Sequence, residues 1–303
     1  MHKVIKEIFK LLPLQGKKLI NQLDRLSSEE LQALDDLCDS MEVFLENYNV
    51  SDSFIAESYK NLNNMMLQQQ IFFKKHCKYK SESQNDVNNN LYSVQEKMIG
   101  HMISLALTQF LWKNHYEMMN YFKNKIIHYL KNNSHILEIG AGHGLFTKEL
   151  LNLNYELKID ILDISNSSIE LSKQIIKSLN NEIFNSVNFI HADITKFKTD
   201  IKYDFISMSE VLEHVDKPQE LLNSLNALLA DDGIVYLTTC ANCPSSDHVY
   251  LFNTIDEIRN MIKSSGFKIV DELMISAENV TIEEAERLKL PMNYSSFLRV
   301  FND

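Results

Sequence analysis

Positive charge is the property that this sequence of 303 residues most clearly lacks. It contains 30 lysines and arginines against 41 aspartates and glutamates, and its formal net charge is -11. Proteins that neutralise a nucleic-acid backbone carry a clustered excess of basic residues. The one basic run, at residues 74–80, has the composition of a solvated helix end. We therefore expect no nucleic-acid partner, and a small molecule as the substrate.

Long apolar runs are also missing. Four charged residues interrupt the first ten positions, which excludes the uninterrupted apolar region of a signal peptide. No stretch is apolar enough to span a bilayer, so we expect no membrane partner.

Cysteine is scarce, with four residues that show no disulfide-like spacing. This usage is typical of a reducing compartment, and we expect a cytoplasmic protein. Cys240 and Cys243 form a C-x-x-C pair, but a structural zinc site needs two further ligands at matching spacing. Cys38 and Cys77 are isolated in the sequence. We therefore expect neither a metal nor a redox role for the pair.

The first part of the chain has the apolar spacing of helices. Ser27 followed by Glu30 has the form of a capping box and predicts a helix start. We expect a helical region over residues 1–80 that acts as a lid or a docking element. A polar, Asn-rich linker is expected over 81–92, and further helices over 93–131.

The pattern of apolar residues changes in residues 132–303, where short apolar runs alternate with longer segments of helical spacing. This alternation is typical of βαβ units. It predicts an α/β, Rossmann-like sheet of seven mostly parallel strands with helices on both faces, and a last strand that runs antiparallel. The expected strands lie near 135–139, 157–162, 187–191, 203–208, 233–239, 267–275 and 296–301.

Glycine is rare, yet three of the seven glycines fall within residues 140–144. Glycine lets a strand turn sharply into a helix and lets a ligand approach bare backbone beside free N–H groups. The pattern here is G-x-G-x-G, because Leu145 stands where the dinucleotide-binding motif has its last glycine. A nucleotide-type ligand is therefore indicated, but not a dehydrogenase.

With Glu138 before these glycines and Asp163 at the end of the next expected strand, the sequence resembles the class I S-adenosylmethionine-dependent methyltransferases over residues 135–303. The resemblance implies S-adenosyl-L-methionine as the cofactor. In that family Gly140 and Gly142 would face the methionine part of the cofactor, and Glu138 would hold its amino group. Asp163 would accept hydrogen bonds from both ribose hydroxyls.

Two later motifs extend the resemblance. The run HADI offers Asp193 for the adenine amino group and places Ile194 beside the ring. In YDFISMSEVLEHV, Ser209 and Glu210 would lie near the methionine part and the substrate. The order of these features along the chain matches the strand ends at which ligands bind open α/β sheets.

The substrate side is less defined. A hydroxyl acceptor needs a group that takes its proton, and His248 lies in the loop expected to form the rim of the pocket. His115 and Tyr116 lie in an aromatic and Met-rich segment before the core, which we expect to cover the cofactor. These three residues are the candidate catalytic or substrate-contacting side chains.

The motif E-x-x-E-H leaves a second interpretation open. Glu210, Glu213 and His214, with His248, resemble the metal-supporting residues of ubiquinone-type O-methyltransferases. The same motif occurs in members of the family that use no metal, and we expect no metal.

The sequence therefore predicts an enzyme that methylates a hydroxyl group of a small secondary metabolite. One alternative is a protein or carrier-bound substrate docked by the N-terminal helices. The other is a non-catalytic binding protein that keeps the cofactor fold. Neither the compound nor the oligomeric state is indicated by the sequence.

Overall fold

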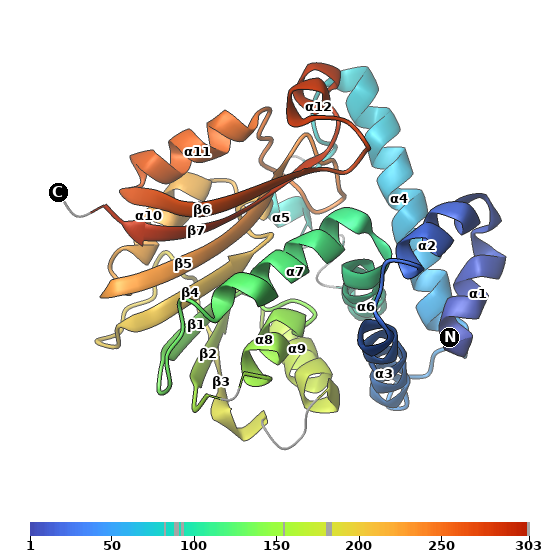
Figure 1. Ribbon diagram of the computed structural model, residues 1–303, viewed down its shortest axis with the longest axis horizontal. Coiled ribbons are helices and arrows are strands. Elements are labelled where there is room, and N and C mark those ends of the chain that lie inside the picture. Colours follow the sequence, from blue (N-terminus) through green and yellow to red (C-terminus); the bar gives the residue numbers. More distant parts are fainter. Residues whose placement is uncertain (82, 88–90, 92–93, 154, 180–183, 302–303) are drawn as a thin grey trace.

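A single seven-stranded sheet forms the centre of the molecule (Figure 1). The structure is a computed structural model that describes residues 1–81, 83–87, 91, 94–153, 155–179 and 184–301. The strands are β1 (His135–Ile139), β2 (Lys158–Asp163), β3 (Val187–His191), β4 (Tyr203–Ser209), β5 (Leu229–Ala241), β6 (Phe267–Ser276) and β7 (Met292–Val300).

The strand order is β3-β2-β1-β4-β5-β7-β6. Strands β1 to β5 pair in parallel, whereas β7 lies antiparallel between β5 and β6. This confirms the predicted fold class and the antiparallel last strand. The middle strands are buried on both faces, which explains their unbroken apolar runs in the sequence.

Helices cover both faces of the sheet. On one face α7 (Lys113–Ile126), α8 (Leu145–Leu151) and α9 (Asn166–Leu179) share a core with Ile136 and Phe205. On the other face α10 (Pro218–Leu225) and α11 (Ile255–Ser264) pack around Leu137 and Ile206. The short helix α12 (Ile282–Leu288) precedes the last strand.

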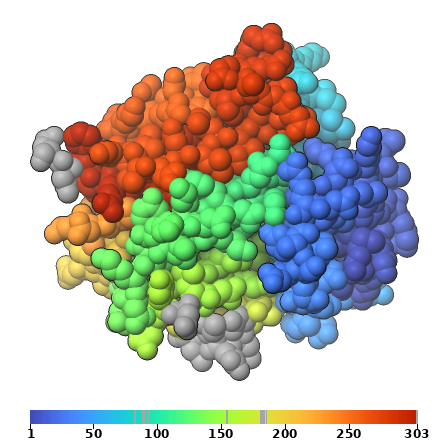
Figure 2. Space-filling model, viewed as in Figure 1, coloured from blue at the N-terminus to red at the C-terminus, as the bar shows by residue number. Residues whose placement is uncertain are grey.

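The N-terminal helices, apart from the short α5, contribute residues to the same hydrophobic core as the first face. They are α1 (Lys3–Leu11), α2 (Gly16–Leu23), α3 (Ser28–Leu45), α4 (Phe54–His76), α5 (Gln84–Val87) and α6 (Gln95–Leu111). The capping box at the start of α3 is confirmed, since Ser27 and Glu30 exchange both hydrogen bonds. Figure 2 shows this region packed directly against α7 and its neighbours. None of the described helices is long and apolar enough to cross a lipid bilayer.

The predicted linker, residues 81–92, lies in part outside the described residues, at 82, 88–90 and 92. Its described part packs against the C-terminal half of the chain. Ser81 Oγ donates to the Ser246 carbonyl at 2.5 Å, and the Gln84 N–H donates to the Asp216 carboxylate at 3.1 Å. Val87 is buried, so this segment contributes to the core.

The glycine turn gives a test of the fold. The backbone φ is +74° at Gly144 and +51° at Gly142, and a Cβ at Gly144 would overlap Ile176 of α9. A Cβ at Gly142 would meet no described protein atom closer than 3.9 Å. We expect Gly144→Ala to lower the free energy of unfolding by about 2–5 kcal/mol, from overpacking plus left-handed strain.

Gly142→Ala is the matched control, because it adds the strain without the overlap and should cost only about 1–2 kcal/mol. Urea denaturation of both variants measures the difference. Equal losses would show that α9 does not pack on the turn as described.

Candidate functional site

A cavity of about 880 Å³ lies at the carboxyl ends of the parallel strands. Its floor is the glycine turn after β1 and the ends of β2 and β4, and its walls include α4, α6 and the start of α7. Ligands bind open α/β sheets at this edge, next to the point where the strand order reverses. The reversal here lies between β1 and β4, which are neighbours in the sheet.

The three glycines of the turn have different surroundings. Gly140 and Gly142 both line the cavity and have positive φ. The space beside Gly142 is open, so a ligand can lie against its backbone. At Gly144, by contrast, the space that a side chain would need is filled by the side chain of Ile176. The part of the motif that is open to the cavity is therefore Gly140 to Gly142.

Polar atoms without a protein partner lie next to this turn. Glu138 is buried and accepts a short hydrogen bond from the Thr147 hydroxyl, and burial raises the pKa of its carboxyl to about 7. At the end of β4, the buried atoms Ser209 Oγ and Glu210 Oε1 have no hydrogen-bond partner of ordinary geometry among the described residues, although Glu213 and Thr238 lie close to the Glu210 carboxyl. Unpaired buried polar atoms are costly, so their presence beside a cavity fits a polar ligand.

Asp163 and Asp193 line the same cavity with different electrostatic character. Burial raises the pKa of Asp163 to about 6, although its Oδ1 accepts from the Ser165 N–H at 2.8 Å. Hydrogen bonding by Thr195 holds the pKa of Asp193 below its usual value, with Lys196 adding an ion pair at 2.9 Å. Asp163 therefore has more free acceptor capacity than Asp193. The buried side chain of Ile194 also lines the cavity.

His115 lies on the opposite wall. Thr108 donates its hydroxyl proton to the Leu105 carbonyl at 2.6 Å, so at 2.7 Å its oxygen accepts from His115 Nδ1. The other ring nitrogen of His115, Nε2, therefore carries the free lone pair of the imidazole. Burial lowers the pKa of this imidazole to about 3, and the ring is neutral at pH 7.

His248 lines the cavity and is 7% exposed. Its Nδ1 donates to the Cys243 carbonyl at 2.6 Å. Burial, with nearby His214, lowers its pKa to about 4.

Tyr116 requires a correction. Its hydroxyl donates to the Glu30 carboxylate at 2.9 Å, so the side chain is directed at α3. It is not among the described residues that line the cavity. On α7 the face that carries His115 and Met118 lies on the cavity, whereas Tyr116 packs against the N-terminal helices.

The sequence reasoning missed a buried acid-base pair. His101 Nε2 lies 3.0 Å from Asp247 Oδ2, and His214 Nδ1 lies 3.6 Å from the same oxygen. Burial opposes ionisation of Asp247, but His214 and His101 hold its pKa well below the usual value. All three residues line the cavity. No sequence signal connects His101 to Asp247, because 146 positions separate them.

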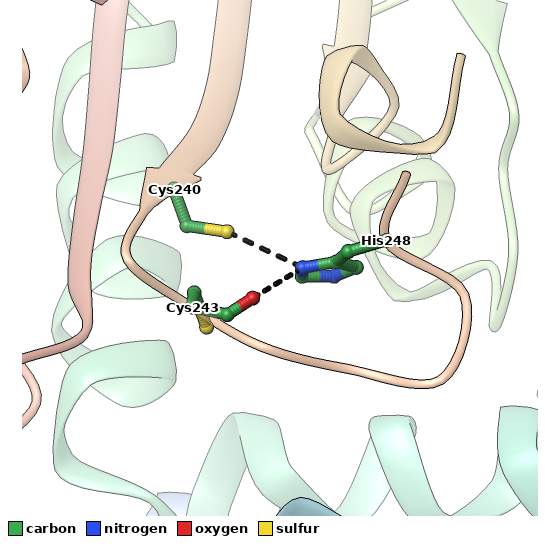
Figure 3. A group of neighbouring side chains, drawn as sticks. All are labelled: Cys240, Cys243 and His248. Carbon is green, nitrogen blue, oxygen red and sulfur yellow. Dashed lines mark hydrogen bonds between the residues drawn. The ribbon is translucent and has the colours of Figure 1, made fainter. Parts of the chain in front are cut away.

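The E-x-x-E-H segment forms a strand end followed by a 3-10 turn over Leu212–His214. Glu213, His214 and His248 have ligand-type atoms within 4.8 Å of one another. Glu210 instead forms such a group with Glu213 and Cys240. A third group joins Cys240, Cys243 and His248 (Figure 3).

Comparisons with known proteins support a methyltransferase domain. Residues 137–235 match the family model described as "Methyltransferase domain". Malonyl-acyl-carrier-protein O-methyltransferase 1 of Ilyobacter polytropus is 29% identical over 134 residues, which are 43% of this chain and 48% of that protein. The mitochondrial ubiquinone biosynthesis O-methyltransferase of Schizosaccharomyces pombe is 22% identical over 208 residues. This match covers 59% of this chain and 75% of that protein. The chain thus spans about half the length of the first of these relatives.

Among solved structures, the crystal structure of the 4+2 cyclase SpnF is similar with a TM-score of 0.50 and 12% sequence identity. The match covers 62% of this chain and 85% of that chain. It supports the fold alone. Because that neighbour is described as a cyclase, the reaction of this chain has to be argued from its site.

Proposed function

We propose that this chain, which carries a methyltransferase domain of the class I fold, transfers the methyl group of S-adenosylmethionine to a hydroxyl group of a small molecule. The observation that carries the proposal is the floor of the cavity. There, an open Gly142 backbone, a carboxylate at the end of β2 and two unpartnered polar atoms at the end of β4 surround one space.

This arrangement fits the cofactor residue by residue. Glu138, Gly140 and Gly142 would receive the methionine part, with Ser209 and Glu210 beside it. Asp163 would accept from the two ribose hydroxyls, because a carboxylate offers acceptor sites for two donors. Ile194 would pack against the adenine ring, and Asp193 would accept from its amino group. The cofactor supplies a methyl group bound to a positively charged sulfur.

The opposite half of the cavity suits an apolar acceptor with one acidic proton. Met98, Met102 and Trp112 give it an apolar wall. His101, oriented by Asp247, is the group that would take the hydroxyl proton, and the neutral His115 and His248 would contact the substrate. A carboxylate that orients an imidazole also stabilises the imidazolium that forms. The walls exclude water and hold the acceptor in line with the methyl group.

The raised pKa of Asp163 gives a pH test of the cofactor site. Its ionised form makes the stronger hydrogen bonds, so affinity for S-adenosylmethionine should fall as the pH drops below about 6. Asp163→Asn should bind roughly tenfold to a hundredfold more weakly at higher pH, from losing charge-assisted bonds of about 1.5–3 kcal/mol. The variant should also lose the pH dependence near 6. Calorimetric titrations across this range measure both effects.

Glu138 serves as the internal reference in that experiment, because burial raises the pKa of its carboxyl to about 7. Any change in affinity that is due to Glu138 should therefore persist in Asp163→Asn. An unchanged pH profile in the variant would place the ribose elsewhere.

Methyl transfer is tested with S-adenosylmethionine carrying a labelled methyl group and a panel of apolar aromatic acceptors bearing hydroxyl, amino or thiol groups. We expect label on hydroxyl acceptors. His101→Asn should slow transfer roughly a hundredfold to ten-thousandfold if His101 takes the proton. His128→Asn, at an exposed position away from the cavity lining, is the control. Transfer to amines alone, or equal rates in both variants, contradicts the proposal.

One observation favours a second candidate function, in which the acceptor is bound to a carrier protein. Exposed Lys18, Lys74 and Lys217, with half-buried Lys113, lie on the cavity lining of this acidic chain. They suit the phosphodiester of a carrier's prosthetic arm. Under this alternative, Lys18→Glu with Lys74→Glu should slow transfer to the carrier-bound substrate and leave transfer to its free analogue unchanged.

A further inference from the structure

Two cysteines and a histidine converge beside the substrate half of the cavity. Figure 3 shows Cys240 at the end of β5 with its sulfur directed at the His248 ring, while Cys243 and His248 lie on the loop that follows. The Cys240 Sγ to His248 Nδ1 distance is 3.8 Å, and ligand-type atoms of all three residues lie within 4.8 Å of one another. All four cysteines of the chain are free thiols.

These distances suit a zinc-type ion. Zinc takes four tetrahedral ligands with Zn–S near 2.3 Å and Zn–N near 2.0–2.1 Å, which implies an S···N separation of about 3.6 Å. The observed Sγ to Nδ1 distance is close to this value. To bind the ion, Nδ1 would give up the proton that it donates to the Cys243 carbonyl, and the other ring nitrogen, Nε2, would carry the remaining proton. Drawing the remaining atoms onto one ion requires shifts of about 1 Å at most. The three ligands lie on one strand end and its loop, so such shifts involve a short segment.

Glu213 is the nearest carboxylate for a fourth ligand, although it does not belong to the group with Cys243 and would have to move toward the ion. Its Oε1 lies 3.9 Å from Cys240 Sγ, and it also belongs to the group with His214 and His248. Its other oxygen accepts from the Thr239 hydroxyl at 2.7 Å. Metal-ligating carboxylates commonly have such a second hydrogen bond that fixes their orientation.

The surrounding charge also favours a cation. Glu210, Glu213 and Asp247 are packed together around the cluster. Within the described part of the chain, none of them forms an ion pair with lysine or arginine; Asp247 lies beside His101 and His214 and accepts a hydrogen bond from the Ser245 hydroxyl. Burial raises the pKa of both Glu210 and Glu213 and so favours their neutral forms, whereas a divalent ion would stabilise the ionised carboxylates and thiolates.

We propose that Cys240, Cys243 and His248 bind a zinc ion, with Glu213 as the fourth ligand. The site goes beyond the proposed methyl transfer and does not depend on it. The sequence reasoning rejected a metal at the C-x-x-C pair because it looked for further cysteines. The third ligand, His248, lies five positions after Cys243, in the spacing C-x2-C-x4-H, and the fourth comes from the turn after β4.

Cobalt is the probe for this site, because thiolate ligands give Co²⁺ a near-ultraviolet charge-transfer band and tetrahedral geometry gives intense visible bands. Reduced protein freed of metal by a chelator is titrated with Co²⁺, and zinc is then added. We expect both sets of bands, displaced by about one equivalent of zinc. Binding should release protons, since the thiols must ionise.

Cys240→Ser and Cys243→Ser should each weaken cobalt binding about tenfold or more and reduce the charge-transfer band. Cys77→Ser, at an exposed cysteine outside the cluster, is the matched control and should bind as the unmodified chain does. Far-ultraviolet circular dichroism checks the folding of each variant. Cys243 is only partly buried, so its variant keeps the test valid if the buried Cys240 does not tolerate serine.

Cobalt bound without a charge-transfer band would assign the ion to the oxygen and nitrogen ligands of Glu210, Glu213 and His214, and would overturn the proposal. So would a band that both cysteine variants retain, or the absence of cobalt binding in reduced protein. Calorimetry with S-adenosylmethionine on the same samples reports on the cofactor site separately. A failure of the metal proposal is thereby distinguished from a failure of the proposed function.

Discussion

The left-handed turn between β1 and α8 is the constraint on which the rest of the site depends. Gly140, Gly142 and Gly144 all have positive φ, a conformation that costs other residues about 1–2 kcal/mol each. The turn brings α8 back against the sheet and allows close packing with α9 through Gly144. It also leaves the Gly142 backbone bare at the edge where β2 and β4 present their polar ends. A cofactor floor follows directly from this geometry.

The helical cover turns that floor into a cavity that remains partly open to solvent. Residues of α4, α6 and α7 line it, and the N-terminal helices share one apolar core with α8 and α9. The lid or docking role expected of the first part of the chain stays a prediction. The cover also introduces His101, which reaches Asp247 on the loop after β5. The substrate half of the site is therefore made jointly by the cover and by that loop.

The elements of the core could be predicted because buried parallel strands are continuous apolar runs between helical periods. The ends of β1, β3 and β4 agree with the sequence to within one residue, whereas β5 begins earlier and β7 begins four residues earlier than expected. The lining of the cavity by Glu138, Gly142 and Asp163 agrees with their expected place at strand ends.

Other features depend on tertiary packing and have no local signal. The sequence does not show which face of α7 meets the cavity, so Tyr116 was misplaced. The pairing of His101 with Asp247 joins segments that are far apart in the sequence. The hydrogen bond described between Asp247 and a histidine therefore involves a distant residue, although His248 is the neighbour of Asp247 in the chain. The approach of Glu213 to Cys240 requires the folded ends of β4 and β5. Spacing within one segment could not reveal it.

The central claim is that the polar strand ends around Gly142 hold S-adenosylmethionine. A crystal structure of the protein with S-adenosylhomocysteine, the product of the cofactor, tests it most directly. We expect both ribose hydroxyls within hydrogen-bond distance of Asp163, and the amino-acid part against Gly140 and Gly142 with Ser209 or Glu210 as a polar partner. A bound molecule whose ribose lies away from β2, or whose methionine part does not reach the glycine turn, would contradict the account.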